Sequence, residues 1–332
     1  MWRVCRQSHR SPSASAVVRA EAPASPPSGE LPASAENAPE HVANYTISAR
    51  LDPASHTVFA EGSATLKNTS SVPLREIWLH LYLNAFKNDK SAFFRERVAG
   101  GRGTASPKSW GSIDVQSFRR GSVDLWPSAE LHRPGDDDET DVKVTLDRPL
   151  PPGESTTFQM SWRSILPTVV ERTGYAGSFH MVGQWFPKFA KLESDGTFAH
   201  FPFHHLAEFY ADFGTYDVTI DVPESFKVGA TGTRTHSEAK SGHRIDRYEQ
   251  DRIHDFAFAA WDRFEEREET MNGVRVRILY PPGYDGVARR GLETIRFALP
   301  HFEKRYGSYP YPVLTLVHPP EGDADEAGGM EY

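Results

Sequence analysis

Cysteine is nearly absent from this chain, since its 332 residues include only Cys5. A single cysteine excludes an internal disulfide and a zinc site built on cysteine ligands. An excess of basic charge is lacking too, because the formal net charge is −8 and the isoelectric point is about 6.0. Nucleic-acid-binding proteins usually carry a basic stripe, so we expect no nucleic-acid partner.

Long apolar runs are also missing. The sequence contains no stretch of about 18 apolar residues, which predicts that no segment spans a membrane. The first 20 residues carry four arginines but no continuous apolar segment, so no secretory signal is visible. The compartment stays open between the cytoplasm and export.

The familiar catalytic motifs do not occur. No His-Glu dipeptide is present, so the metal-binding motif His-Glu-x-x-His is absent. Gly-x-Ser-x-Gly, Gly-x-Gly-x-x-Gly and the P-loop are missing as well. The pattern His204-His205-x-x-Glu208 is a poor metal site, because adjacent side chains of an extended segment point to opposite faces. We expect no catalytic residue and no metal ligand within this chain.

The N-terminal part divides into a leader and a β-rich domain. Residues 1–42 are rich in Ala, Pro and Ser, which predicts disorder. From Asn44 apolar and polar residues alternate with a period of two, as in half-buried strands. Turns rich in Pro, Gly and Asp separate these runs, so residues 43–263 are predicted to form an antiparallel saddle-shaped or sandwich domain. The expected strands are Tyr45–Leu51, Thr57–Lys67, Ile77–Leu83, Val142–Leu146, Thr157–Trp162, Tyr216–Val222 and Phe256–Trp261.

Between Phe93 and Trp110 lies an insertion rich in Gly, Arg and Ser. Residues of this kind between periodic segments are typical of loops. We expect a mobile surface loop there.

Residues 264–332 have a different, mixed pattern. A strand around Val274–Ile278 precedes an amphipathic helix predicted over Asp285–Tyr306, and Gly307 is expected to end that helix. Pro300 is expected to kink or split it. A strand over Leu314–Val317 follows. This segment is too short for a complete α/β domain with its own core, so we expect an incomplete domain.

The chain ends in Gly328-Gly329-Met330-Glu331-Tyr332. Glycines have no Cβ, so an extended peptide can approach their backbone closely. The carboxylate of Glu331 is suited to a charge-assisted hydrogen bond with an ammonium group, such as the free N-terminus of a peptide.

An aromatic patch at Trp185–Lys188 has two interpretations. Packing in the core is one. The other is that Gln184 and its neighbours line a substrate cleft, where the Gln184 carbonyl oxygen can accept a hydrogen bond from an N-terminal ammonium.

Taken together, these segments resemble the M1 family of zinc aminopeptidases, in the subgroup whose exopeptidase motif reads Gly-Gly-Met-Glu-Tyr. The resemblance covers roughly residues 43–332. The segments that carry it are Tyr45–Leu83, Gln184–Lys188, Phe209–Val218, Ile253–Ala260, Phe302–Pro312 and Gly328–Tyr332.

The resemblance implies a set of substrate-binding residues. Glu331 would hold the free α-amine of the substrate, the backbone of Gly328, Gly329 and Met330 would lie along it, and Gln184 would be a second anchor. Tyr332 stands where many family members have Asn. The family's zinc ligands lie C-terminal to this motif and have no counterpart here.

Two hypotheses follow. In the first, the chain is the N-terminal part of a zinc-dependent aminopeptidase acting on peptides with a free N-terminus, with a thermolysin-like α/β catalytic domain that is cut short at residue 332. Zn²⁺ would then belong to the full-length protein, and this fragment would bind none and be inactive. In the second, the chain is a non-enzymatic β-sandwich binding module. Exposed apolar surface on the helix Asp285–Tyr306 would favour the first, because its apolar stripe would then be left uncovered.

Overall fold

The structure is a computed structural model that describes residues 40–99, 107–132, 138–204 and 210–322. Strands dominate it, so the prediction of a mainly β protein is confirmed. Residues 1–39, most of the expected leader, lie outside the described residues. Val42 already belongs to the fold, because its side chain is buried and its N–H donates to the carbonyl oxygen of Phe213 at 2.9 Å. No helix in the described ranges has the length and apolarity needed to cross a membrane.

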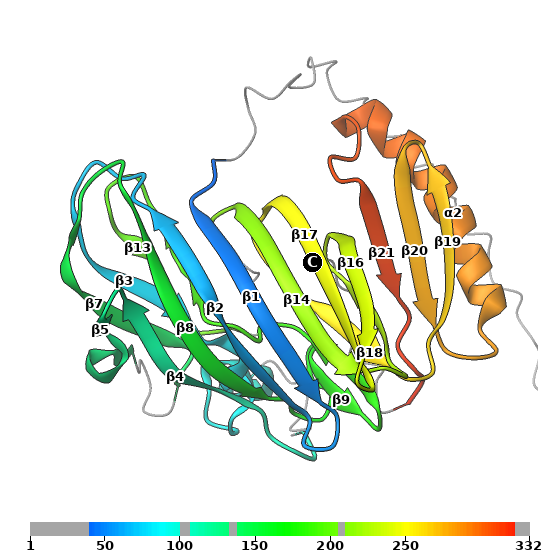
Figure 1. Cartoon of the computed structure of the whole chain (residues 1–332), viewed down its shortest axis with the longest axis horizontal. Helices are drawn as coiled ribbons and strands as arrows, with labels where there is room; N and C mark the ends of the chain where they lie inside the picture. Colours follow the sequence, from blue (N-terminus) through cyan, green and yellow to red (C-terminus); the bar gives the residue numbers. More distant parts are fainter. Residues whose placement is uncertain (1–39, 100–106, 133–137, 205–209, 323–332) are drawn as a thin grey trace, which may run out of the picture.

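The largest sheet has eight strands in the order β16-β17-β14-β1-β2-β8-β4-β5 and forms the long twisted layer of Figure 1. Neighbouring strands are antiparallel except for the central pair β1–β14, which is parallel. The strands are β1 (Ala43–Asp52), β2 (Thr57–Lys67), β4 (Ser112–Arg120), β5 (Val123–Asp124), β8 (Ser155–Ile165), β14 (Gly214–Pro223), β16 (Thr233–Lys240) and β17 (His243–Ile253).

The alternation in β1 shows why this sheet has one buried face. Tyr45, Ile47, Ala49 and Leu51 are buried, while the residues between them face outward. Tyr45 stacks on Tyr216 of the neighbouring strand β14, with ring centroids 4.8 Å apart. Period-two patterning therefore placed the core residues of this strand correctly.

Three smaller sheets lie against the buried face of the large one or next to it. One runs β15-β18-β10-β9, a second runs β11-β3-β7-β6, and a two-stranded piece pairs β12 with β13. Their bounds are β3 (Leu74–His80), β6 (Glu130–His132), β7 (Asp141–Leu150), β9 (Gly174–Ala176), β10 (Phe179–Val182), β11 (Lys188–Phe189), β12 (Lys191–Leu192), β13 (Phe198–Ala199), β15 (Lys227–Ala230) and β18 (Phe258–Trp261). A continuous apolar core fills the space between these sheets and the large one.

The C-terminal elements form a three-stranded sheet, β19-β20-β21, with the helix α2 along one face (Figure 1). The bounds are β19 (Glu265–Met271), β20 (Val274–Tyr280), α2 (Asp285–Tyr306) and β21 (Val313–Val317). Ala288 and Leu292 of α2 are buried against the strand side chains Val276 and Ile278. The predicted bounds of this helix are confirmed.

Gly307 ends α2 as predicted, with φ of 91° and its N–H donating to the carbonyl oxygen of Glu303 at 3.0 Å. Pro300, however, does not split the helix, which continues through it to Tyr306. A proline removes only one backbone donor, and the packing of α2 on the sheet lies mostly in the turns before Pro300. Of the two expected effects, the split was wrong, and the kink stays a prediction.

Two other predictions were wrong in detail. The expected strand Ile77–Leu83 ends at His80, and Tyr82–Phe86 form a 3₁₀ helix, η2. The expected loop after residue 92 begins as a helix, α1 (Ala92–Ala99), because Phe93 and Phe94 anchor it in the core beside Phe86. Residues 100–106 lie outside the described residues. A second short 3₁₀ helix, η3, covers Trp126–Ser128.

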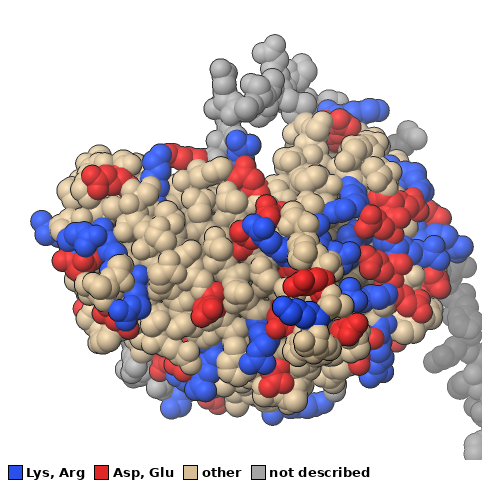
Figure 2. Space-filling view, in the orientation of Figure 1, with Lys and Arg blue, Asp and Glu red and all other residues tan. Residues whose placement is uncertain are grey.

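The charged surface is distributed unevenly. Figure 2 shows many charged side chains over the region of β19, β20 and α2, and a largely uncharged area over β8, β2 and β1. The edge strand β19 reads Glu-Glu-Arg-Glu-Glu-Thr-Met and is mostly exposed. Charges on an edge strand oppose pairing with other chains.

Candidate functional site

The sequence-predicted site residues fall in two places. Gly328, Gly329, Met330 and Glu331 lie outside the described residues, as does Tyr332. Gln184 is described, and the site can therefore be built only from its surroundings.

The backbone at Gln184 has an unusual conformation for a residue other than glycine, with φ of 56°. Such conformations cost energy and persist only where the surroundings impose them. Here the preceding Gly183 carbonyl accepts a hydrogen bond from the Thr173 hydroxyl at 3.0 Å. The following Trp185 carbonyl accepts from the Trp162 indole at 2.9 Å and from the Ser164 hydroxyl at 2.6 Å. The turn is therefore fixed from both sides.

The aromatic patch next to Gln184 belongs to the core. Trp185 and Phe186 are buried, and the Trp185 indole donates to the Phe256 carbonyl at 3.0 Å. The ring of Phe186 packs edge-on against Tyr45, with centroids 5.4 Å apart. The core-packing interpretation of Trp185–Lys188 is thus correct for these aromatic side chains.

Gln184 itself reaches a buried carboxylate. Its amide nitrogen Nε2 lies 3.0 Å from Oδ2 of Asp255, and the ammonium of Lys188 lies 2.7 Å from the same oxygen. The other oxygen, Oδ1, accepts the backbone N–H of Phe256 at 2.8 Å. The side chains of Lys188 and Asp255 are 3% and 1% exposed, and Gln184 is 6% exposed. The three residues form one interior polar cluster, the Gln184–Lys188–Asp255 cluster.

Two histidines lie around this cluster. His80 is opposite Lys188 in the β3–β11 pair and is buried, which lowers its pKa well below the usual value, with nearby Lys188 acting in the same direction. Burial also lowers the pKa of His254, next to Asp255 in the chain; Asp255 opposes this shift and Lys188 adds to it. Both imidazoles are therefore neutral at pH 7.

The cluster does not fit a zinc ion. Three donor groups surround the Asp255 carboxylate, and none of them can bind a metal ion through its hydrogen. One of these groups is the positively charged ammonium of Lys188, which would repel a zinc ion. Across the described ranges, no group of three or more His, Cys, Asp or Glu side chains is placed to hold a metal ion. Nδ1 of His204 lies 2.5 Å from Oε1 of Glu96, while His205 and Glu208 lie outside the described residues.

Sequence reasoning missed Lys188 and Asp255 as partners of Gln184. A signal was present, because each is a charged residue within an aromatic segment: Trp-Phe-Pro-Lys-Phe and His-Asp-Phe-Ala-Phe. Charged residues are almost never fully buried unless they are paired. The pattern predicts two buried charges of opposite sign, although not that they meet.

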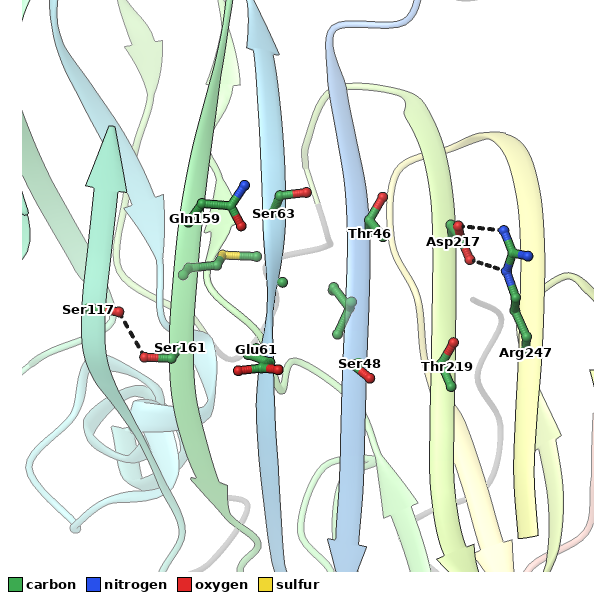
Figure 3. Close-up of a pocket in the computed structure, with 13 residues that line it drawn as sticks. Thr46, Ser48, Glu61, Ser63, Ser117, Gln159, Ser161, Asp217, Thr219 and Arg247 are labelled. Atoms are coloured by element: carbon green, nitrogen blue, oxygen red, sulfur yellow. Dashed lines mark hydrogen bonds and ion pairs between the residues drawn. The ribbon is translucent and has the colours of Figure 1, made fainter. Parts of the chain in front are cut away.

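A separate hollow of about 650 Å³ lies on the outward face of the large sheet (Figure 3). Short polar side chains line it in cross-strand rows. Ser117 and Ser161 share a hydrogen bond of 2.8 Å, and Asp217 accepts two hydrogen bonds of 2.8 Å from Arg247. Phe186, two residues after Gln184, packs against Tyr45 on the other, buried face of this sheet, so the hollow and the cluster are separate features.

Comparison with models of known protein families gives no match, and comparison with curated proteins gives none either. Solved structures do match. The M1 zinc metallopeptidase from Deinococcus radiodurans has a TM-score of 0.50 at 16% identity, over 84% of this chain and 57% of that one. A point mutant of it gives 0.50 at 15% identity, over 83% and 55%. A two-domain M1 zinc metallopeptidase mutant bound to L-arginine gives 0.50 at 16% identity, over 84% and 57%.

These matches define the class of fold. Over most of its described length, the chain is folded like part of an M1 zinc metallopeptidase. It spans little more than half the length of those structures.

Proposed function

We propose that this chain is the N-terminal part of a zinc-dependent M1-like aminopeptidase that removes N-terminal residues from peptides. The observation that carries this is a coincidence of two independent features. The described residues have the fold of M1 zinc metallopeptidase structures, and the sequence ends in Gly-Gly-Met-Glu-Tyr, with Glu331 suited to bind an amine.

The chain's own task in this proposal is recognition of the substrate's free amine. The Glu331 carboxylate accepts hydrogen bonds from the ammonium, and the carbonyl oxygen of Gln184 accepts another. The backbone at Gly328 and Gly329 lies along the peptide. Anchoring the terminal amine places the first peptide bond at a fixed distance, which defines an exopeptidase. In this proposal the zinc ligands belong to a further segment of the protein. Within the described ranges, no group of three or more His, Cys, Asp or Glu side chains is placed to hold a metal ion.

Exposed apolar side chains on α2 favour the proposal that a further segment of the protein packs on this helix. Phe302 and Tyr306 of the predicted apolar stripe are 54% and 74% exposed, and neighbouring Phe297 is 73% exposed. Large apolar side chains clustered on a surface usually mark a contact with another segment or partner. In the proposed enzyme, the rest of the catalytic domain would cover them.

The first test measures hydrolysis. This chain with added zinc should not cleave an aminoacyl-p-nitroanilide, whereas a longer form containing a downstream His-Glu-x-x-His should. In that longer form, Glu331→Ala should lower kcat/KM by about 10–100-fold, the loss expected for a charge-assisted hydrogen bond. Zinc content, measured by metal analysis, should not change.

Unaltered kinetics in the Glu331→Ala variant would remove the anchor role of this residue. A coding sequence that ends at Tyr332, with no zinc motif behind it, would favour the alternative of a non-enzymatic β-sandwich binding module.

A further inference from the structure

A side-chain amide can face a neighbour with its nitrogen or with its oxygen, depending on a 180° turn about its last bond. For Gln184 the neighbouring carboxylate of Asp255 determines the orientation of the amide. Oδ2 of Asp255 lies 3.0 Å away, and an ionised carboxylate can only accept hydrogen bonds. The amide nitrogen must therefore face Asp255, and the carbonyl oxygen Oε1 must point the other way.

The carboxylate that sets this orientation is itself held in place. The Phe256 N–H holds Oδ1 at 2.8 Å, and the Lys188 ammonium holds Oδ2 at 2.7 Å. Lys188 also compensates the charge of Asp255 in an interior where an unpaired carboxylate would be very costly. These hydrogen bonds consequently hold the Asp255 carboxylate against rotation.

The backbone adds a third constraint. With φ of 56° at Gln184, and with the carbonyls of Gly183 and Trp185 each bound by side chains, the amide extends from a fixed starting point. A hydrogen bond from the amide N–H to a charged acceptor also polarises the amide, which makes its carbonyl oxygen a better acceptor.

We propose that Asp255 is a positioning residue for amine recognition: by fixing the Gln184 amide, it presents Oε1 as an acceptor for the ligand's α-ammonium. This inference rests on the proposed function, since it concerns the same amine site. The ligand class is a primary ammonium next to a carbonyl, as at the N-terminus of a peptide. A neutral acylated amine has no charge to offer and would be rejected.

The test uses the 332-residue chain and two probes, L-leucinamide and its N-acetyl derivative, followed by NMR titration. The wild type should bind leucinamide and discriminate against the acetylated compound. In Asp255→Ala no acceptor faces the Gln184 amide, so the amide can turn over, and the nearby Lys188 ammonium attracts its carbonyl oxygen. The affinity for leucinamide should fall about tenfold, as for the loss of one hydrogen bond to a charged group.

Asp212→Ala is the matched control. Asp212 is also a buried carboxylate that accepts hydrogen bonds from a lysine, Lys191 at 3.2 Å, and from a backbone N–H, that of Leu192 at 2.7 Å, and neither partner is a glutamine. The Asp212 variant should lose stability as the Asp255 variant does, but it should keep the affinity of the wild type for leucinamide. Equal weakening in both variants would show that the effect of Asp255 is general damage to the fold, and would overturn the inference.

A second readout does not depend on ligand binding. The side-chain NH₂ signals of Gln184, assigned by their absence in Gln184→Leu, should exchange slowly with solvent in the wild type and faster in Asp255→Ala. Unchanged exchange overturns the orienting role of Asp255 even if leucinamide binds. If instead the exchange changes as expected but the wild type binds neither probe, the proposed amine site fails, and with it the role of Asp255 in recognition.

Discussion

At the scale of residues, a pair of imidazoles joins two sheets. His56 lies in the turn between β1 and β2, His180 lies on β10, and Nδ1 of the first is 3.0 Å from Nε2 of the second. The Nδ1 of His180 lies 2.9 Å from the Ser178 carbonyl and must donate to it, so its Nε2 is the acceptor. The His180 ring is therefore neutral, and His56 donates to it from Nδ1. Burial lowers the pKa of His180 to about 4, and the nearby His56 adds to the shift.

This pair predicts acid sensitivity. The unfolded chain takes up a proton at His180 near pH 6.5, while the folded chain does so only near pH 4. The stability due to His180 is thus fully present above about pH 6.5 and is lost as the pH falls toward 4, by about 3 kcal/mol. Urea unfolding at pH 7 and pH 4.5 should show a smaller decrease in the free energy of unfolding for His180→Gln than for the wild type. Equal decreases would assign the acid sensitivity to other groups.

The role of a residue could be predicted from the sequence where a pattern repeats. It could not be predicted where the role depends on a single contact in the folded protein. The buried residues of β1 follow directly from alternation. The contact between Gln184 and Asp255 joins positions 71 residues apart, and nothing local to either segment encodes it. The predicted roles of Gly328, Gly329, Met330 and Glu331 remain predictions, because these residues lie outside the described ranges.

At the scale of elements, α2 combines a strong local signal with an internal proline. Its period and its terminal glycine predicted both ends correctly. By contrast, sequence reasoning missed β16, because this edge strand is almost entirely exposed and its residues, Thr-Arg-Thr-His-Ser-Glu-Ala-Lys, show no apolar alternation. Its strand conformation comes from pairing with β17. Strands with a regular apolar alternation, such as β1, are therefore predictable from the sequence, whereas β16 and the inner strand β4 (Ser112–Arg120) were not predicted.

Pro300 gives a test at this scale. Because it lies inside a continuous helix, replacing it restores a backbone donor and removes a ring that opposes helical geometry. Pro300→Ala should raise the free energy of unfolding by about 1–3 kcal/mol, measured by chemical denaturation. Pro282→Ala, at an exposed turn position before the helix, is a control for the loss of a proline outside a helix. A lower stability of Pro300→Ala would mean that the proline ring makes contacts worth more than its cost.

At the scale of the whole molecule, the expected boundary near residue 264 crosses a shared core. Phe179, Trp261 and Phe264 pack in one buried cluster with Leu279 of β20, and Val317 of β21 packs against them. A Cβ placed on Gly229 of β15 would lie 3.0 Å from the Leu279 side chain, which shows how closely the sheets approach. The two predicted domains therefore meet through an apolar contact.

This contact predicts how a shortened chain behaves. A chain ending at Arg263 would leave Phe179 and Trp261 without the side chains that cover them. It should unfold at a lower urea concentration than the full chain and bind the dye ANS, which reports exposed apolar surface. A shortened chain of undiminished stability that binds no ANS would instead support an independent domain over residues 43–263.

The sequence alone determined the mainly β class, the positions of several strands with one buried face, and the limits of α2. These features depend on apolar periodicity and on residues that end a helix, and both are local properties of the sequence. Tertiary structure decided that Tyr82–Phe86 and Ala92–Ala99 turn into short helices, that β1 and β14 pair in parallel, and that Lys188 and Asp255 meet beside Gln184. Each of these requires segments distant in the chain to pack together, and only the folded arrangement supplies that information.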